Sequence, residues 1–375
     1  MDYAATTPVD RRVAKSMMKF LDPDGVFGNP ASRTHVYGWQ AEEAVENARV
    51  QVAGVINADP REIVWTSGAT ESDNLAIKGL AHKAKKKHII TSKIEHKAVL
   101  DTCHFLEEDG FDVTFLEPDL RGCCSAKQVQ DAITSETLLV SLMHVNNELG
   151  SITDVAAIAK ICQDNNVFFH VDAAQGFGKL KVDVRATGID LLSVSGHKIY
   201  GPKGIGVIFV NRESDFSLNP LIHGGGHEFG MRSGTLATHQ IVGLGEASEL
   251  IRIEGAGEAK NYDKFRDILL SNLNQIPDVH INSDPSSCIP SIVNVSFGGV
   301  DGETLMNALD NVALSSGSAC NSELIEPSYV LKGIGLVDKL ANSALRFSFG
   351  RYTEESEVQA VSSQVARVVG ALRNA

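Results

Sequence analysis

The sequence predicts an α/β protein in which a large domain with a mostly parallel sheet is joined to a smaller α+β domain. Between residues 62 and 210, short and almost fully apolar stretches alternate with longer stretches whose apolar residues have helical spacing. This alternation is typical of parallel strands buried between helices. After Gly255 the pattern changes to one long helical stretch followed by short alternating strands. A chain of 375 residues is long enough for one large and one smaller domain.

The elements of the large domain follow from local patterns. The opening segment, residues 1–8, has no helical periodicity and is expected to pack as an extended arm. Helices are expected at 9–20 and 37–56, on either side of a loop rich in glycine, asparagine and proline. The apolar runs predict strands at 62–66, 88–91, 113–116, 138–143, 167–171, 191–194 and 206–210. The stretches between them predict helices at 71–86, 97–109, 126–132 and 155–165.

The smaller domain is expected to contain two strands before its last loop, a strand around Arg346 and a closing helix. Its predicted elements are a helix at 258–275, strands at 279–281 and 292–297, a helix at 303–310, a loop at 315–322 and a helix at 354–372. We therefore divide the chain into a large domain of residues 8–256 and a small domain made of residues 1–7 and 257–375, which carries the 315–322 loop.

The composition excludes several classes of protein. A net charge of -13 argues against a general nucleic-acid binder, which normally has a basic excess. No apolar run approaches the roughly 18 residues of a membrane span, and the N-terminus lacks the apolar core of a signal peptide. None of the six cysteines forms a C-x-x-C pair, so a zinc or redox framework is not expected. We expect a protein of the cytosol or of an organelle matrix.

Several polar side chains follow predicted strands, where a parallel sheet presents its ligand site. The stretch from Thr66 to Asp73 has the order strand, glycine turn and helix N-terminus, with Thr70 and Asp73 placed for a capping box. Free N–H groups at such a helix start bind phosphate well, although capping alone also explains the pattern. Asp172, with Gln175 three residues on, ends another strand. Taken alone, Asp172 suits a metal, a ribose or a cationic ring.

His96 and Asn147 also follow strands, and a lone histidine there is more often an ordinary loop residue. Lys198 comes after the strand that begins at Leu191, and three glycines and a proline in residues 199–206 keep it in a loop. A lysine in this place is either a charge that reaches solvent or an amine kept for chemistry.

The set of these residues meets the needs of pyridoxal 5′-phosphate. Lys198 supplies an amine for the cofactor aldehyde, and the carboxylate of Asp172 keeps the pyridine nitrogen protonated. The helix start after Thr66 binds the phosphate, to which Ser195 and His197 could also donate, and a flat histidine covers the ring.

Two residues of the smaller domain limit which reactions the protein could catalyse. Cys320 lies among serine, glycine, alanine and asparagine in residues 315–322, with nothing apolar to bury its thiol, so we expect it to be reactive. Arg346 alternates with apolar residues along a strand. A buried arginine needs a carboxylate partner, such as that of an amino-acid substrate.

The motifs that carry these residues resemble those of the cysteine desulfurases of the NifS/IscS type, in the class V aminotransferase family. The matching stretches are residues 66–74, 170–175, 195–202, 230–235 and 315–320. The resemblance covers essentially the whole chain and is greatest to the IscS branch. It implies a fold-type I pyridoxal-phosphate transferase with a seven-stranded type of sheet, working as a homodimer with active sites at the subunit interface.

The resemblance also implies a role for each site residue. Lys198 is the Schiff-base lysine, Asp172 pairs with the pyridine nitrogen, Gln175 pairs with the ring hydroxyl, and His96 stacks on the ring and shuttles protons. The remaining cofactor-binding residues, mostly around the phosphate, are Ala69, Thr70, Asn147, Ser195, Gly196, His197 and Thr235, the last reaching in from the partner subunit.

For the substrate, the resemblance implies that Asn147 and Arg346 hold the carboxylate of L-cysteine. Cys320 attacks the substrate sulfur, which leaves a persulfide on the enzyme and releases L-alanine. No intrinsic metal site is implied, although Cys320 is a transient iron–sulfur ligand together with a scaffold protein.

The implied partners are sulfur acceptors for iron–sulfur cluster assembly and tRNA thiolation, with no membrane and no direct nucleic acid. The sequence ends at Ala375, soon after its last predicted helix. Relatives of the IscS type usually continue with a C-terminal tail that helps to dock the scaffold protein, so docking of the scaffold is implied less strongly. The expected location is the cytoplasm of a bacterium, or the mitochondrial matrix if the source is eukaryotic.

Other functions stay open at this point. A selenocysteine lyase or another enzyme of the class V aminotransferase type would share most of these residues, although an aminotransferase has no use for Cys320. A non-catalytic subunit with the same fold would have no reason to hold Lys198, Asp172, His96 and Cys320 together. A dinucleotide-dependent dehydrogenase is disfavoured because no G-x-G-x-x-G follows the first strand.

Overall fold

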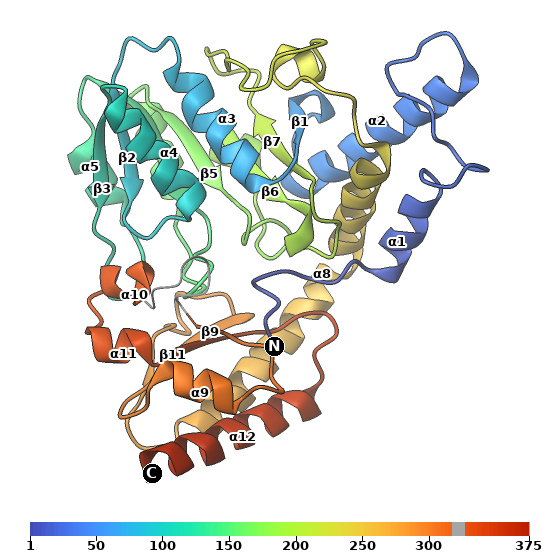
Figure 1. Ribbon diagram of the computed structural model, residues 1–375. Helices are drawn as coiled ribbons and strands as arrows, with labels where there is room; N and C mark the ends of the chain where they lie inside the picture. Colours follow the sequence, from blue (N-terminus) through green and yellow to red (C-terminus); the bar gives the residue numbers. More distant parts are fainter. Residues whose placement is uncertain (317–326, 375) are drawn as a thin grey trace.

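The computed structural model describes residues 1–316 and 327–374 and contains two sheets, each covered by helices (Figure 1). The larger sheet has seven strands in the order β1-β7-β6-β5-β4-β2-β3. In chain order these are β1 (Ile63–Thr66), β2 (His88–Ser92), β3 (Asp112–Leu116), β4 (Thr137–Met143), β5 (Phe168–Asp172), β6 (Leu191–Ser195) and β7 (Gly206–Val210). All of them except the edge strand β3 are almost fully buried, which explains the apolar runs in the sequence.

The larger sheet is mostly parallel. Strands β3, β2, β4, β5 and β6 run parallel to one another, whereas β7 is antiparallel to both of its neighbours, β6 and β1. The predicted fold class, an α/β protein with a mostly parallel sheet and a smaller α+β part, is therefore confirmed. The register sets Asp172 beside Met143 on one side and Ser193 on the other. Asp172 thus ends its strand where the sheet presents its ligand edge.

Helices pack on both faces of the larger sheet (Figure 1). The predicted boundaries agree with the structure to within a few residues for most of them. The helices of this part are α1 (Arg11–Met18), α2 (Val36–Ile56), α3 (Ala69–Ala81), α4 (Lys97–Glu108), α5 (Ala126–Ala132), α6 (Val155–Asp164) and the short α7 (Val184–Thr187).

The prediction was wrong about the start of α3. Helix α3 begins at Ala69, and its N-cap is Gly68, with a φ of 153° and no side-chain cap. Glu71 instead accepts a hydrogen bond from the backbone N–H of Ser67 at 2.7 Å. Asp73, which the predicted capping box would place at the helix surface, is buried inside the first two turns.

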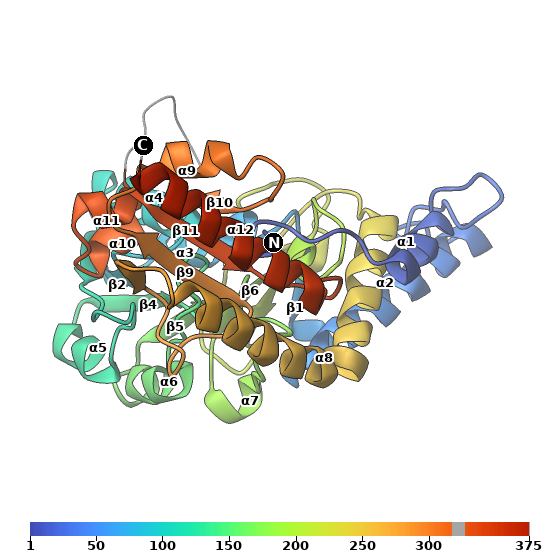
Figure 2. The ribbon, with the colours of Figure 1, turned by 90° about the horizontal axis from the view of Figure 1, so that it is seen from below.

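The second correction concerns α8, which runs unbroken over Thr238–Leu273. The sequence predicted a helix only from residue 258, after the change of pattern near Gly255. Glycine in a helix interior costs about 1 kcal/mol relative to alanine, but packing outweighs a cost of this size. The first half of α8 packs on α1 and α2, and its second half packs on α12 (Glu355–Arg373). Figure 2 shows this helix passing from one sheet region to the other.

The smaller sheet has the order β10-β11-β9-β8 and carries Arg346 in its centre. Its elements are β8 (Val279–Ile281), β9 (Ile292–Phe297), α9 (Gly302–Ala308), β10 (Ser315–Ser316), α10 (Tyr329–Gly333), α11 (Asp338–Asn342) and β11 (Ala344–Ser348). Apolar side chains of β9 and β11 pack against α8 and α12 and form a separate core. None of the described helices has both the length and the apolar character that crossing a bilayer requires.

The N-terminal arm joins the two sheets. Near its start, the backbone N–H of Ala4 donates to Ser348 Oγ at the end of β11, at 2.9 Å. Further along, Thr7 contacts the turn after β6: its hydroxyl donates to His197 O at 3.0 Å and accepts from Tyr200 N–H at 2.7 Å. The backbone N–H of Thr7 also donates to His197 O, at 2.9 Å. The predicted extended arm therefore fixes the turn that carries Lys198.

We expect Thr7→Val to lower the free energy of unfolding by about 1–3 kcal/mol, because it leaves the buried N–H of Tyr200 without an acceptor. Urea unfolding measures this loss. The control is Thr7→Ser, which keeps the hydroxyl and should lose much less. Equal losses in the two variants would show that the methyl group, and not the hydrogen bonds, is what matters.

Candidate active site

The ends of β5 and β6 form the floor of the candidate site, with Asp172 at its centre. The Asp172 side chain is buried, and its Oδ1 accepts a hydrogen bond from Ala174 N–H at 2.8 Å. Burial raises the pKa of Asp172, while the Ala174 hydrogen bond and electrostatic interactions with His96 and Lys198 act in the opposite direction. The structure thus brings Asp172, His96 and Lys198 close enough to interact electrostatically.

Lys198 ends the short turn Gly196–Lys198 that follows β6, and its side chain is half-buried. Its Nζ donates to the backbone carbonyls of Ala4 and Ala5, each at 2.8 Å. The amide Nε2 of Gln175 donates to the same Ala4 carbonyl at 2.8 Å. Lys198 and Gln175 therefore meet at one backbone oxygen of the N-terminal arm.

A second part of the site lies at the N-terminus of α3, where Ala69 and Thr70 provide backbone N–H groups without intrahelical partners. Ser195 ends β6 beside this helix start. A side chain on Gly206, which pairs with Ser195, would come within 2.6 Å of the Gly68 Cα, so only glycine allows β7 to approach this turn. The structure thus places two of the features that are expected to bind the phosphate side by side. These are the N-terminus of α3 and Ser195.

His197 adds a neutral imidazole near this end of the site. Its Nδ1 is 3.0 Å from Thr6 Oγ1. Burial, together with the positive charges of Lys198 and Lys203, lowers the pKa of His197 to about 4. The ring is therefore neutral at pH 7 and has one N–H to donate.

His96 is the N-cap of α4, and its Nδ1 accepts a hydrogen bond from Ala98 N–H at 3.1 Å. This bond places the ring hydrogen of the neutral form on Nε2. His96 is exposed.

Asn147 and Arg346 lie together, as the sequence predicts. Arg346 Nη1 donates to the Asn147 backbone carbonyl at 2.8 Å, and Nη2 donates to Asp2 Oδ1 at 2.9 Å and to Ser315 Oγ at 3.0 Å. Two buried polar atoms, Arg346 Nε and Asn147 Oδ1, have no hydrogen-bond partner among residues 1–316 and 327–374. Unpaired buried groups of this kind are costly, and they fit a carboxylate ligand with an adjacent amine.

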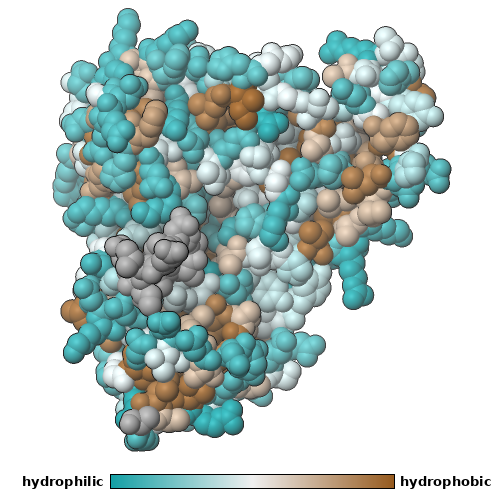
Figure 3. Space-filling view, viewed as in Figure 1, coloured by the Kyte–Doolittle hydropathy of each residue, from teal (hydrophilic) through white to brown (hydrophobic). Residues whose placement is uncertain are grey.

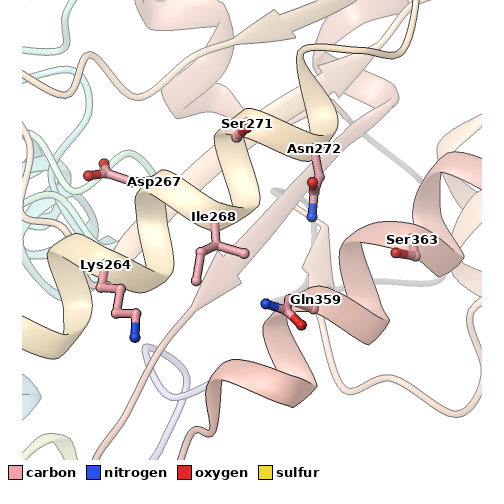
Figure 4. A pocket seen from close by; sticks show the side chains of 7 residues that line it. All are labelled: Lys264, Asp267, Ile268, Ser271, Asn272, Gln359 and Ser363. Atoms are coloured by element: carbon pink, nitrogen blue, oxygen red, sulfur yellow. The ribbon is translucent and has the colours of Figure 1, made fainter.

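Of two hollows in the described part of the chain, only one is lined by a predicted site residue. A cavity of about 80 Å³ is lined by Lys198, Ala4 and Thr7 together with residues of α8 and β9. A larger and more open hollow of about 860 Å³ lies between α8 and α12 (Figure 4). Its lining residues are Lys264, Asp267, Ile268, Ser271, Asn272, Gln359 and Ser363. The volume of a hollow therefore does not identify the site. The site is identified by the amine of Lys198, the amide of Gln175 and the carboxylate of Asp172, which lie close together.

Two predicted residues are not part of this cluster. Thr235 is exposed, and no hydrogen bond is found for its side chain among the described residues. Cys320 lies outside the described residues, so its prediction is not tested by the geometry. The other predicted side chains lie at the strand ends, at the start of α3 or on β11.

A buried polar layer beneath Asp172 was not predicted. His170, two residues before Asp172 on β5, has Nδ1 at 2.8 Å from Ser141 Oγ and Nε2 at 2.9 Å from Ser193 Oγ. Its Nε2 is 3.6 Å from Oδ1 of the fully buried Asp73. Burial lowers the pKa of His170 to about 3, so this histidine is neutral. The spacing of two residues between His170 and Asp172 could have predicted this layer, because it places both side chains on one face of the strand.

Asp73 lies in this layer without a positively charged partner. Neither carboxylate oxygen has a hydrogen-bond partner of normal geometry in the part of the chain that the structure describes. Burial raises its pKa well above the usual range, and the negative charge of Asp172 raises it further, with a partial offset from the Ser193 hydroxyl. Asp73 is thus a neutral carboxylic acid, whereas Asp172 carries the hydrogen bond and the favourable charges.

Comparison with known proteins places these residues in a family context. The family model "Aminotransferase class-V" matches residues 1–361. The curated "Cysteine desulfurase IscS" of Shewanella oneidensis is 56% identical over 375 residues, which are 100% of this chain and 93% of that protein. The protein of the same name from Pseudomonas entomophila is 55% identical over the same shares.

Solved structures show the same likeness. A structure titled "NIFS-LIKE PROTEIN" has a TM-score of 0.92 and 36% identity, and it covers 99% of each chain. A structure titled "SspA in complex with cysteine" has a TM-score of 0.83 and 42% identity over 94% of this chain and 99% of the other.

We expect Asp73→Asn to raise the free energy of unfolding at pH 8 by about 1–3 kcal/mol. Folded Asp73 keeps its proton, whereas the unfolded chain releases it above about pH 4, so this residue makes stability fall as pH rises from there. The uncharged amide removes that loss, and the gain should shrink towards pH 4.

Thermal unfolding at several pH values, with the exposed Asp109→Asn as the control, measures this difference. A variant that is less stable than the parent at pH 8 would mean that Asp73 is ionised in the folded chain.

Proposed function

We propose a function from the premise that this chain belongs to the class-V aminotransferase family. It is a cysteine desulfurase that depends on pyridoxal 5′-phosphate and converts L-cysteine to L-alanine. One observation in the structure carries this conclusion: Lys198, Gln175 and Asp172 converge at the ends of β5 and β6, in a chain whose whole length matches curated cysteine desulfurases.

The residues present fit the cofactor. We assign its ring nitrogen to the buried carboxylate of Asp172 and its ring hydroxyl to Gln175, with the exposed ring of His96 as the cover. We assign its phosphate to the N–H groups at the start of α3 and to the side chains of Ser195 and His197, with Thr235 of the partner subunit added. When bound, the cofactor supplies a cationic ring that withdraws electrons from the substrate carbon.

Asp172 supports this chemistry by its position. Its carboxylate is shielded from water, so its attraction for a cationic group is weakly screened. A cationic ring held by Asp172 would lower the pKa of this carboxyl group and favour its ionised form, as the interactions with His96 and Lys198 do. The neutral state of Asp73 leaves Asp172 as the negative charge beneath the ring.

Substrate binding is assigned to Asn147 and Arg346. The unpaired Arg346 Nε and Asn147 Oδ1 provide a donor for the cysteine carboxylate and an acceptor for an N–H group. Lys198 is assigned as the base that takes the proton from the substrate α-carbon, and His96 moves protons at the outer side through its Nε2.

Sulfur transfer is assigned to the thiolate of Cys320. It attacks the substrate sulfur, so that a sulfur–sulfur bond forms and the bond between Cβ and sulfur breaks, with the electron pair staying on carbon. That carbon takes a proton and becomes the methyl group of alanine. The persulfide on Cys320 then passes its outer sulfur to an acceptor thiol, or a thiol reductant releases it as sulfide.

The acceptors are proposed to be those of iron–sulfur cluster assembly and tRNA thiolation, with Cys320 as a transient ligand beside the scaffold protein. The large unit of residues 8–256 is proposed to hold the cofactor, and the unit of residues 1–7 and 257–375 to carry Cys320. A cytoplasmic location is proposed as well, in keeping with the free thiols of the five described cysteines.

A homodimer is proposed because apolar side chains are exposed together on and around α1 and α2 (Figure 3). These residues, each about half exposed or more, are Met18, Leu21, Phe27, Val36, Tyr37 and Trp39. Phe27 and Tyr37 stack with ring centroids 5.5 Å apart on the outside of the molecule. A patch of large apolar groups on one projecting part is typical of a subunit interface.

The function is tested with the purified protein loaded with pyridoxal 5′-phosphate. We expect a yellow protein that forms alanine and sulfide from L-cysteine and a thiol reductant. Cys320→Ala should keep the absorbance of the cofactor but lose at least about a hundredfold in alanine and sulfide formation, because no other thiol replaces the nucleophile. Cys123→Ala is the control and should keep full activity. Full turnover by the Cys320 variant would refute the proposed role of this thiol.

The homodimer is tested with Phe27→Glu combined with Tyr37→Glu. We expect the mass measured by light scattering to fall from twice the chain mass to 40.3 kDa, because charges in a buried apolar interface are costly. Activity should fall with it, since Thr235 of the partner subunit would no longer reach the phosphate. Leu120→Glu, at a side chain that is 80% exposed elsewhere, is the control and should stay dimeric. A double variant that keeps the parent mass would contradict this interface.

A further inference from the structure

Lys179 is a second lysine beside the candidate site to which no role has been assigned so far. It follows Gln175 by four residues, after a turn in which Gly178 has a φ of 75°. Its Nζ donates to Gln175 Oε1 at 2.5 Å. The other end of the same amide, Nε2, donates to Ala4 O, which also accepts from Lys198 Nζ.

The chemistry of these groups fixes which way the amide faces. In its ammonium form Lys179 can only donate hydrogen bonds, and its Nζ lies at the Gln175 amide oxygen, so this oxygen turns towards Lys179. The NH₂ end of Gln175 then faces the Ala4 carbonyl and the side of the site where Lys198 lies. An amide turned the other way would set its NH₂ group against the Lys179 ammonium and its oxygen against the Ala4 carbonyl, and both contacts are unfavourable.

The surroundings of Lys179 make this contact strong. Lys179 and Lys198 both line the 80 Å³ cavity, where water does not fully screen them. Burial, together with the positive charges of Lys198 and Arg346, lowers the pKa of Lys179 to about 7. Other charged or titratable groups that face the two lysines among the described residues are Tyr3, Asp172, Tyr200, Glu258 and Tyr262. Only Asp172 among these is also in the proposed cofactor machinery.

We propose that Lys179 is a positioning residue that holds the Gln175 amide with its NH₂ group towards Lys198 and the cofactor ring. This inference rests on the proposed function, because it gives Gln175 the ring hydroxyl as its target. Lys179 acts through Gln175 and does not touch the reacting atoms. A lysine that only packs against the cavity wall would leave the Gln175 amide free to choose its direction.

The test compares Lys179→Met with Lys179→Arg in the dimeric, cofactor-loaded protein. Methionine keeps the length of the side chain but cannot donate, whereas arginine keeps both the donors and the charge. Lys181→Met, at an exposed lysine two residues away, is the matched control. Far-UV circular dichroism and the melting temperature show that each variant is folded.

The first measurement is the pH titration of the cofactor absorbance without substrate, which reports the pKa of the nitrogen of Lys198. In Lys179→Met the midpoint should rise by about half to one pH unit, because a positive charge is lost and the amide oxygen can turn towards that nitrogen. The midpoints of Lys179→Arg and Lys181→Met should stay within about 0.2 pH units of the parent.

The second measurement is the kinetics of alanine formation. In Lys179→Met, kcat should fall about tenfold, the scale of one hydrogen bond, with KM for L-cysteine changed less than about twofold. Lys179→Arg should restore most of kcat. An unchanged midpoint and kcat in Lys179→Met, or a loss in Lys179→Arg as large as that in Lys179→Met, would overturn the proposal. Failure of the parent protein to form alanine would instead refute the proposed function. The absorbance titration would still test the positioning role of Lys179 in that case.

Discussion

The site depends on the contacts between the N-terminal arm and the turn that carries Lys198. Tyr200 in this turn has a φ of 65°, a conformation that a bulky residue adopts only when its surroundings enforce it. Thr7 supplies two of the enforcing contacts, to His197 O and from Tyr200 N–H, and Tyr200 Oη accepts from the backbone of Arg351 at 2.5 Å. Because Ala4 and Ala5 of the same arm hold the Lys198 amine, one segment fixes both the backbone and the side chain of the key residue.

Charged groups also tie this turn to the segment that follows the second sheet's strand β11. Arg351, just after β11, donates to Asp10 Oδ2 and to Glu258 Oε1, each at 2.6 Å, and its guanidinium lies 4.2 Å from the Tyr200 ring centre. Hydrogen bonds from Arg351 hold the pKa of Asp10 below its usual range, with a larger effect from Arg12. A buried pair of this kind contributes little net stability compared with apolar packing, but breaking it strands a charge. The ion pairs of Arg351 therefore determine the relative position of the two sheets more than they determine the stability of either sheet.

Much of this arrangement could be predicted from the sequence, and the failures have physical reasons. The strands were predictable because both faces of the sheet are covered, which makes each strand an apolar run, and Lys198 and Asp172 were found as polar residues at the ends of such runs. Helix α8 was predicted too short because glycine propensity is local, whereas packing on α2 and α12 depends on segments far away in the sequence. Lys179 was missed and Asp73 was given a capping role instead of a buried one, because the environment of a polar residue in a turn or helix depends on neighbours that the fold brings to it.

Asp73 and Asp172 are two of three interacting buried carboxyl groups, the third being Glu95, and they raise the question of which one carries the charge near the site. Desolvation acts on both Asp73 and Asp172, and each raises the electrostatic cost of ionising the other. Only Asp172 has an N–H donor, from Ala174, and it alone faces the positive charges of His96 and Lys198. His170, the nearest basic side chain to Asp73, is neutral and already hydrogen-bonded to two serines. The negative charge therefore settles on Asp172 at the strand end, where a cationic ring can use it, and the layer beneath stays uncharged.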